Sequence, residues 1–83
     1  MSFDFAVELK KKRIETRKTQ LEFCRVCGVN QHTYKAWESG RAVPNFENFN
    51  RIVDWLENND CLTDDLIEVY ERSKMGVLAD EIK

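Results

Sequence analysis

The fold is decided by residues 20–40, whose sequence is QLEFCRVCGVNQHTYKAWESG. The spacing predicts two short helices in this stretch: one over residues 20–26 with Thr19 as its N-cap, and one that follows Asn30 and ends near Glu38. Gly28 lies between them, where the end of a helix needs a residue in the left-handed conformation. A connection this short, with a single glycine, makes the two helices cross at a steep angle.

Further helices are predicted on both sides of this pair. The first follows Ser2 or Asp4 as its N-cap and runs to about Arg17. Pro44 opens a fourth helix, and Thr63 caps a fifth. No alternation typical of a strand appears, so we expect an all-α domain of five helices. The core is predicted from apolar residues at helical spacing, which are Phe5, Leu9, Leu21, Phe23, Cys24, Tyr34, Trp37, Phe46, Phe49, Ile52, Val53 and Leu56.

The chain has 83 residues, a length that allows one domain with one core. Its net charge of −2 hides an asymmetry, because residues 1–43 carry nine basic and five acidic residues, whereas residues 44–83 carry four and ten. The first half can therefore meet a polyanion that the second half would repel. No apolar run is long enough to span a bilayer and no signal peptide is recognisable, so we expect a protein of the cytoplasm.

Few side chains are suited to chemistry. Cys24 and Cys27 form a C-x-x-C pair, to which only Cys61 and His32 could add as metal ligands. We interpret these thiols as structural, with metal binding and redox sensing as the alternatives. Because a single histidine leaves no readable nucleophile–base pair, we expect no enzyme, no catalytic residue, no metal and no cofactor.

Several residues around the central pair keep a fixed register: Gln20 opens the first helix, Phe23-Cys24 is an apolar and small pair, and Trp37-Glu38-Ser39-Gly40 ends the second. With Gly28-Val29-Asn30, Thr33 and Pro44, this pattern resembles the Cro/cI-type, lambda-repressor-like helix-turn-helix family from about Leu9 to Leu56. The chain departs from the family at Arg17 and Lys18, where members commonly have a glycine and then an apolar residue. In the family, a small residue is needed at the position of Cys24, where the helix after Asn30 packs on it. Packing therefore explains Cys24.

The resemblance implies double-stranded DNA as the partner, with the helix after Asn30 lying in the major groove. Gln31 could bond twice to adenine, Lys35 could donate to guanine, and His32 could donate to guanine or to a phosphate. The implied base contacts are Gln31, His32, Lys35 and Ala36. The implied contacts to the DNA backbone are Lys18, Gln20, Asn30, Thr33, Gly40 and Arg41, although Thr33 would alternatively be a core residue and Gln20 a plain helix-starting residue.

Arg13 and Glu38 match family positions that form an ion pair between the first helix and the end of the third. The resemblance therefore implies a structural role for this pair. The alternative is two independent surface charges.

Residues 60–83 lie beyond the resemblance and are strongly acidic, so they are poorly suited to DNA contact. We divide the chain into a DNA-binding domain over residues 1–59 and an acidic extension over residues 60–83. This extension is expected to hold a homodimer together through Leu66, Tyr70, Val77 and Leu78. The alternatives are a helix that completes the core of the monomer, and a segment that binds a different protein partner.

These features together predict a sequence-specific transcriptional regulator. The favoured form is a repressor of phage or mobile-element type that binds a two-fold operator as a homodimer. One alternative is an antitoxin-type autoregulator of the same fold. Another is a protein-interaction adaptor that has kept the fold but lost DNA binding, which the net negative charge would suit.

Overall fold

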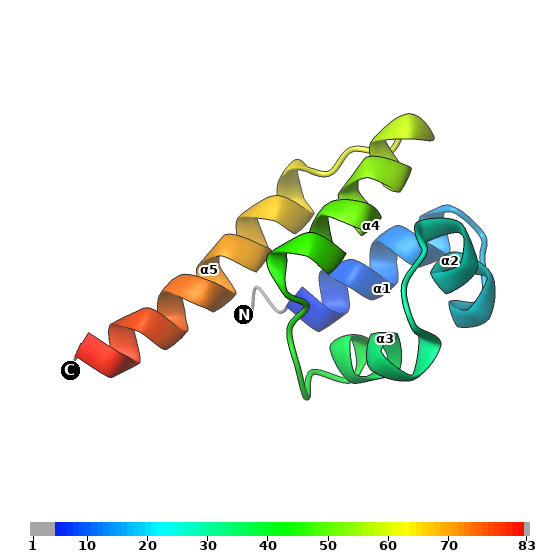
Figure 1. Cartoon of the computed structure of the whole chain (residues 1–83). Coiled ribbons are helices and arrows are strands. Elements are labelled where there is room, and N and C mark those ends of the chain that lie inside the picture. The colour runs from blue at the N-terminus through cyan, green and yellow to red at the C-terminus, as the bar shows by residue number, and fades with distance from the viewer. Residues whose placement is uncertain (1–4, 83) are drawn as a thin grey trace.

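The structure is a computed structural model that describes residues 5–82, and the side chains of residues 5–73. The described chain contains five helices and no strand, which confirms the all-α prediction: α1 (Phe5–Glu15), α2 (Gln20–Cys27), α3 (Gln31–Glu38), α4 (Phe46–Asn58) and α5 (Asp64–Ile82). Helices α1 to α4 and the first half of α5 form the body, and the second half of α5 projects from it (Figure 1). No helix in the described part of the chain is long and apolar enough to cross a membrane.

The predicted caps define the central pair of helices. Thr19 and Glu22 form a reciprocal capping box, in which each side chain accepts a hydrogen bond from the other residue's backbone N–H, at 3.1 and 2.9 Å. Gly28 ends α2 in the left-handed conformation, with φ of 78°. Asn30 caps α3, because its Oδ1 accepts from the backbone N–H of Thr33 at 3.1 Å. The ends of both helices are therefore fixed locally by the sequence.

Three predicted helix ends need correction. The fourth helix is not opened by Pro44: it begins at Phe46, and Asn45 is its N-cap, accepting from the N–H of Asn48 at 2.8 Å. The first helix ends at Glu15 rather than near Arg17, and the second extends to Cys27 instead of residue 26. The predicted caps of the first helix, residues 2 and 4, lie outside the described residues.

The core contains most of the predicted apolar residues, but not Leu21 or Phe46, which are 41% and 67% exposed. The inward face of α2 is formed by Phe23, Cys24 and Cys27. Leu21 lies one position away from this i, i+3, i+4 pattern, and Gln20 takes the place in register. Phe46 has the spacing of a core residue. As the first residue of α4, however, it lies at an open groove between α4 and α5 and stays exposed.

The first half of α5 belongs to the same core. Leu66 and Tyr70 are 0% and 4% exposed, and the Tyr70 ring stacks on Phe49 with the centroids 3.8 Å apart. The core therefore crosses the predicted boundary at residues 59 and 60. Burial within the chain leaves the Leu66 side chain no surface for a partner, which corrects its predicted place in a dimer interface. Tyr70 is a core residue that also lines a groove between α4 and α5. Val77 and Leu78 lie beyond the described side chains.

Arg17 lies in the connection between α1 and α2 with φ of 59°, a conformation that costs a residue with a Cβ atom about 1–2 kcal/mol. We expect Arg17→Gly to raise the free energy of unfolding by about 0.5–1 kcal/mol, because glycine relieves this strain but loses more chain entropy on folding. Urea denaturation measures the change. Arg17→Ala is the matched control: it removes the same side chain but keeps Cβ, so stabilisation by alanine would show that backbone strain is not the cause.

Candidate nucleic-acid interface

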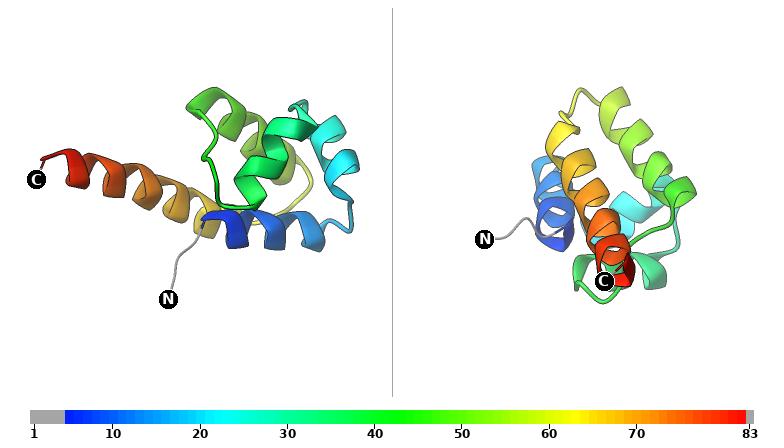
Figure 2. Two further views of the ribbon diagram at one scale, coloured as in Figure 1. Left: turned by 90° about the horizontal axis from the view of Figure 1, so that it is seen from below. Right: turned by 90° about the vertical axis from the view of Figure 1, so that its left-hand side faces the viewer.

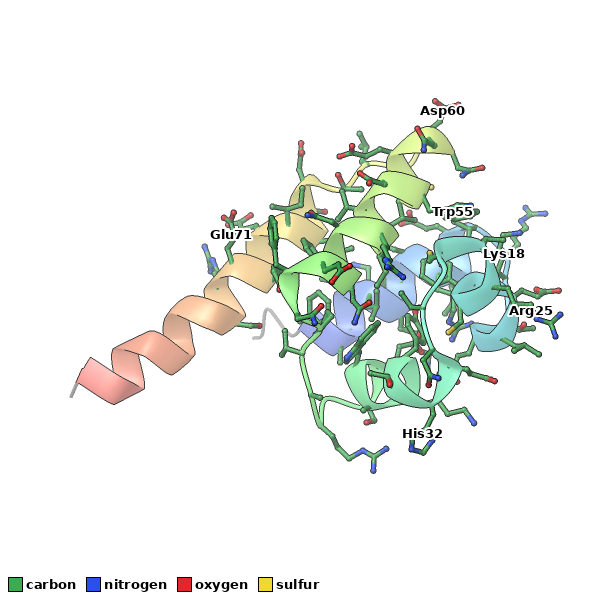
Figure 3. All side chains as sticks on the ribbon, in the orientation of Figure 1. Lys18, Arg25, His32, Trp55, Asp60 and Glu71 are labelled. Atoms are coloured by element: carbon green, nitrogen blue, oxygen red, sulfur yellow. The ribbon has the colours of Figure 1, made fainter. Side chains whose placement is uncertain are left out.

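Helix α3 has one buried side and one polar, accessible side. Tyr34 and Trp37 are 0% and 2% exposed and fix the helix against the core. His32 and Lys35 are exposed, and Gln31 is partly exposed. The remaining predicted base-contact residue, Ala36, is also partly exposed. Figure 3 shows His32 directed away from the body of the protein.

Residues at both ends of α3 extend this accessible surface. Asn30 and Thr33 are exposed at its start, so Thr33 is not a core residue. Gly40 and Arg41 are exposed after its end, and Gly40 has φ of 84°. The backbone N–H of Arg41 donates to the carbonyl of Ala36 at 3.0 Å, which folds this loop back onto α3. The Arg41 guanidinium donates through Nε to the Ser39 hydroxyl at 3.1 Å, which holds it beside the end of α3.

Glu38, the last residue of α3, connects three helices. Its carboxylate accepts two hydrogen bonds from Arg13 of α1, at 2.7 and 3.2 Å, one from the Tyr34 hydroxyl at 2.5 Å and one from the Gln20 amide of α2 at 3.0 Å. The pair with Arg13 is the one that the sequence predicts. Arg13 also donates to the carbonyl of Lys18 at 2.8 Å, so the same guanidinium holds the connection between α1 and α2.

The electrostatics of this cluster follow from its hydrogen bonds. Burial by itself raises the pKa of Glu38, but the hydrogen bonds from Arg13, Tyr34 and Gln20 outweigh it, and the net pKa lies below the ordinary value. The hydrogen bond to Glu38 raises the pKa of Arg13 against the opposing effect of burial. Burial, and then the hydrogen bond to Glu38, raise the pKa of the Tyr34 hydroxyl. The cluster therefore stays ionised as a carboxylate and a guanidinium, with a neutral tyrosine between them.

Two predicted contacts to the DNA backbone have partners within the protein. One amide N–H of Gln20 is directed at Glu38 rather than outward. The Lys18 ammonium lies 5.7 Å from the centre of the Trp55 ring, a cation–π contact. Figure 3 shows Lys18 beside Trp55 and far from His32. The side chains of Gln20 and Lys18 are therefore less available for a contact to DNA than the exposed side chains of α3.

The sequence prediction missed two positioning residues. Arg51 of α4 donates to the carbonyl of Gly28 at 2.9 Å, which connects α4 to the turn between α2 and α3. Arg51 also donates to Glu47, four residues earlier. This spacing was the signal in the sequence that could have drawn attention to Arg51. The second is Tyr34, whose hydroxyl reaches Glu38 one helical turn later. Both fix α3 relative to its neighbours.

The C-x-x-C thiols lie inside the core, with Cys24 2% and Cys27 6% exposed. Burial raises the pKa of Cys24 to about 11 and that of Cys27 to about 12, so both are protonated near neutral pH. Among the described residues, no group of three or more His, Cys, Asp or Glu side chains is arranged to hold a metal ion.

We expect Cys61 to react first with a disulfide reagent such as Ellman's at about pH 8, because it is only partly buried while the other two thiols are shielded and protonated. The absorbance of the released thiolate measures the rate. In urea all three thiols are expected to react together, which provides the control. Reaction of Cys24 or Cys27 at the rate of Cys61 in the native protein would contradict their place in the core.

Comparison with known proteins agrees with this geometry. A model of the helix-turn-helix family matches residues 9–54, just over half of the chain. No curated protein and no solved structure matches the chain. The chain belongs to the Cro/cI-type helix-turn-helix family, which is a family of DNA-binding regulatory domains rather than of enzymes. It is therefore a DNA-binding transcription regulator, and the five helices are those of a lambda-repressor-like domain.

Proposed function

We propose that this protein is a sequence-specific transcriptional repressor that acts in the cytoplasm as a homodimer at a two-fold operator. The observation that carries the proposal is the accessible polar side of α3, held outward by the burial of Tyr34 and Trp37 on its other side. A helix presented in this way fits the major groove, where base edges offer distinct patterns of donors and acceptors.

Each side chain on α3 has a role that its chemistry allows. Gln31 bonds through its amide to an adenine edge, and Lys35 donates to guanine. His32 donates to guanine or to a phosphate, and the methyl group of Ala36 contacts a thymine methyl. These four residues give the sequence preference.

The residues around α3 contact the DNA backbone. Asn30, Thr33, Gly40 and Arg41 are exposed at the two ends of the helix, where backbone amides and a guanidinium group can meet phosphates. Gln20 has a second amide N–H that can donate to a phosphate while the first holds Glu38. Lys18 adds to the attraction of the polyanion by its charge while it lies over Trp55.

Repression follows from occupancy, because a protein bound across a promoter excludes polymerase without a further contact surface. We place the protein with the regulators of phages and mobile elements. A dimer would double the contacts to DNA, since each copy presents one α3 to one half-site.

Selection of bound fragments from a random DNA library tests this function. We expect an enriched sequence with two-fold symmetry, and binding that weakens steeply as salt is added, because phosphate contacts release counterions. Absence of DNA binding even at low salt would contradict the proposal and would favour the interaction adaptor. Enrichment of a sequence without symmetry would leave DNA binding in place but overturn the two-fold operator.

A further inference from the structure

An open apolar groove of about 440 Å³ lies between α4 and α5. Its walls are formed mainly by Phe46, Phe49 and Val53 of α4 and by Ile67 and Tyr70 of α5. Three of these, Phe49, Val53 and Tyr70, belong to the core, and the rings of Phe49 and Tyr70 stack on each other, so the floor of the groove is continuous with the interior of the protein. The floor of the groove is therefore fixed by the packing of the core.

Phe46 stands at this groove with 67% of its surface exposed. The start of α4 does not depend on this ring, because Asn45 supplies the N-cap. An aromatic side chain at the edge of an apolar groove is typical of a surface that another molecule covers.

The second half of α5 indicates which molecule covers the groove. Residues 74–82 continue the helix past the body for about 13 Å, and in the left view of Figure 2 they extend away from the other four helices. A short helix without a partner is only marginally stable in water. The groove runs along α4 from Phe46 to Val53, about 10 Å, which is similar to the length of this projecting segment.

We propose that the groove is the docking surface for a second copy of this chain, and that the projecting half of each α5 lies along the groove of its partner. The contact is isologous, so one two-fold axis covers both grooves and both projecting segments. This inference rests on the proposed dimer at an operator and specifies the surface that forms it.

The size of the interface supports this arrangement. A stable interface covers about 800 Å² on each partner, roughly a seventh of the 5612 Å² of accessible surface of the chain. The groove alone is too small for this, but the groove together with a projecting helix on each copy can reach it. The second half of α5 projects from the end of the body opposite α2 (Figure 1), whereas His32 of α3 points in a different direction (Figure 3). The contact therefore leaves the exposed side of α3 free for DNA.

The test is Phe46→Glu in the full chain, with Leu62→Glu as the matched control. Both change an exposed large apolar residue to glutamate, but Leu62, which is 79% exposed, lies in the connection before α5 and outside the groove. Glutamate at the first position of α4 suits the helix dipole, so the monomer should keep its fold by circular dichroism. In sedimentation equilibrium, we expect the dimer dissociation constant to rise roughly tenfold or more for Phe46→Glu, and to stay unchanged for Leu62→Glu.

Hydrogen exchange locates the projecting segment in the same proteins. We expect the amides of residues 74–82 to be protected in the wild-type dimer, and to lose that protection on dilution and in Phe46→Glu. A dimer as strong in Phe46→Glu as in the wild type would overturn the proposal. So would a wild-type chain that stays monomeric, or a dimer in which residues 74–82 exchange as fast as in the monomer. Binding of Phe46→Glu to a single half-site tests DNA recognition separately, because α3 is unchanged in this variant.

Discussion

Replacing Glu38 with alanine is expected to lower the free energy of unfolding by about 3–5 kcal/mol. The substitution leaves Arg13 charged and only 12% exposed at its side chain, and it removes the acceptor of the buried Tyr34 hydroxyl. It also removes the acceptor of the Gln20 amide, and with it the hydrogen bond to α2. Because the Glu38 carboxylate connects α1, α2 and α3, we expect the loss to affect the whole fold rather than one helix end.

Urea denaturation followed by tryptophan fluorescence measures this loss. Glu47→Ala is the control, because Glu47 also forms an ion pair, with Arg51 at 3.4 Å, but its side chain is 76% exposed. An exposed pair of this kind contributes less than about 1 kcal/mol. If Glu38→Ala were no more damaging than Glu47→Ala, the cluster around Glu38 would not be holding the three helices together.

The same carboxylate gives stability a dependence on pH. Since the folded pKa of Glu38 lies below its ordinary value of 4.5, its contribution is fully present above that value and is lost as the pH falls through the lower, folded pKa. Urea denaturation at a series of pH values is therefore expected to show stability falling on the acid side. Glu38→Gln should flatten this part of the profile, because glutamine does not titrate.

Tyr70→Ala is expected to cost about 3–5 kcal/mol of unfolding free energy. The substitution removes a ring that stacks on Phe49 and lies 5.7 Å from the ring of Phe5, which connects α5 to α4 and α1. It also removes the hydroxyl that donates to the carbonyl of Pro44 at 2.9 Å. Such a loss would show that the first half of α5 is part of the domain core and not a separable extension.

Tyr70→Phe separates the two contributions, because it keeps the stacked ring and removes only the hydroxyl. We expect a loss of about 1–3 kcal/mol from the buried carbonyl of Pro44 that is left without this donor. Thermal denaturation of the wild type, Tyr70→Phe and Tyr70→Ala ranks the three proteins by stability. If Tyr70→Ala were as stable as the wild type, the place of α5 in the core would be wrong.

The fold could be predicted from the sequence wherever a local signal was present. Thr19, Gly28 and Asn30 each act through their own backbone or that of a residue three positions away, and the structure has the predicted cap at each position. The spacing of Phe49, Ile52, Val53 and Leu56 likewise predicted the buried side of α4. Such features depend on short stretches of chain, which a single sequence contains in full.

The errors arose where the outcome depends on packing between distant residues. Phe46 keeps the spacing of the core face, and only the position of α5 leaves its ring uncovered. The place of Tyr70 in the core was missed because the sequence does not reveal that its ring packs against Phe5 and stacks on Phe49. The hydrogen bond from the Gln20 amide to Glu38 was not predicted, because the distance between these residues, 18 positions apart, is set by the crossing of the helices.

The claim that α3 reads DNA is tested most directly by Gln31→Ala and Lys35→Ala, measured by fluorescence anisotropy on the selected operator and on unrelated DNA. Each variant is expected to lose about 1–3 kcal/mol of binding free energy on the operator, with a smaller loss on unrelated DNA and no change in fold. Lys11→Ala removes an equal charge from the exposed side of α1 and controls for net charge. Unchanged operator affinity in both α3 variants would contradict the assignment of this helix to the major groove.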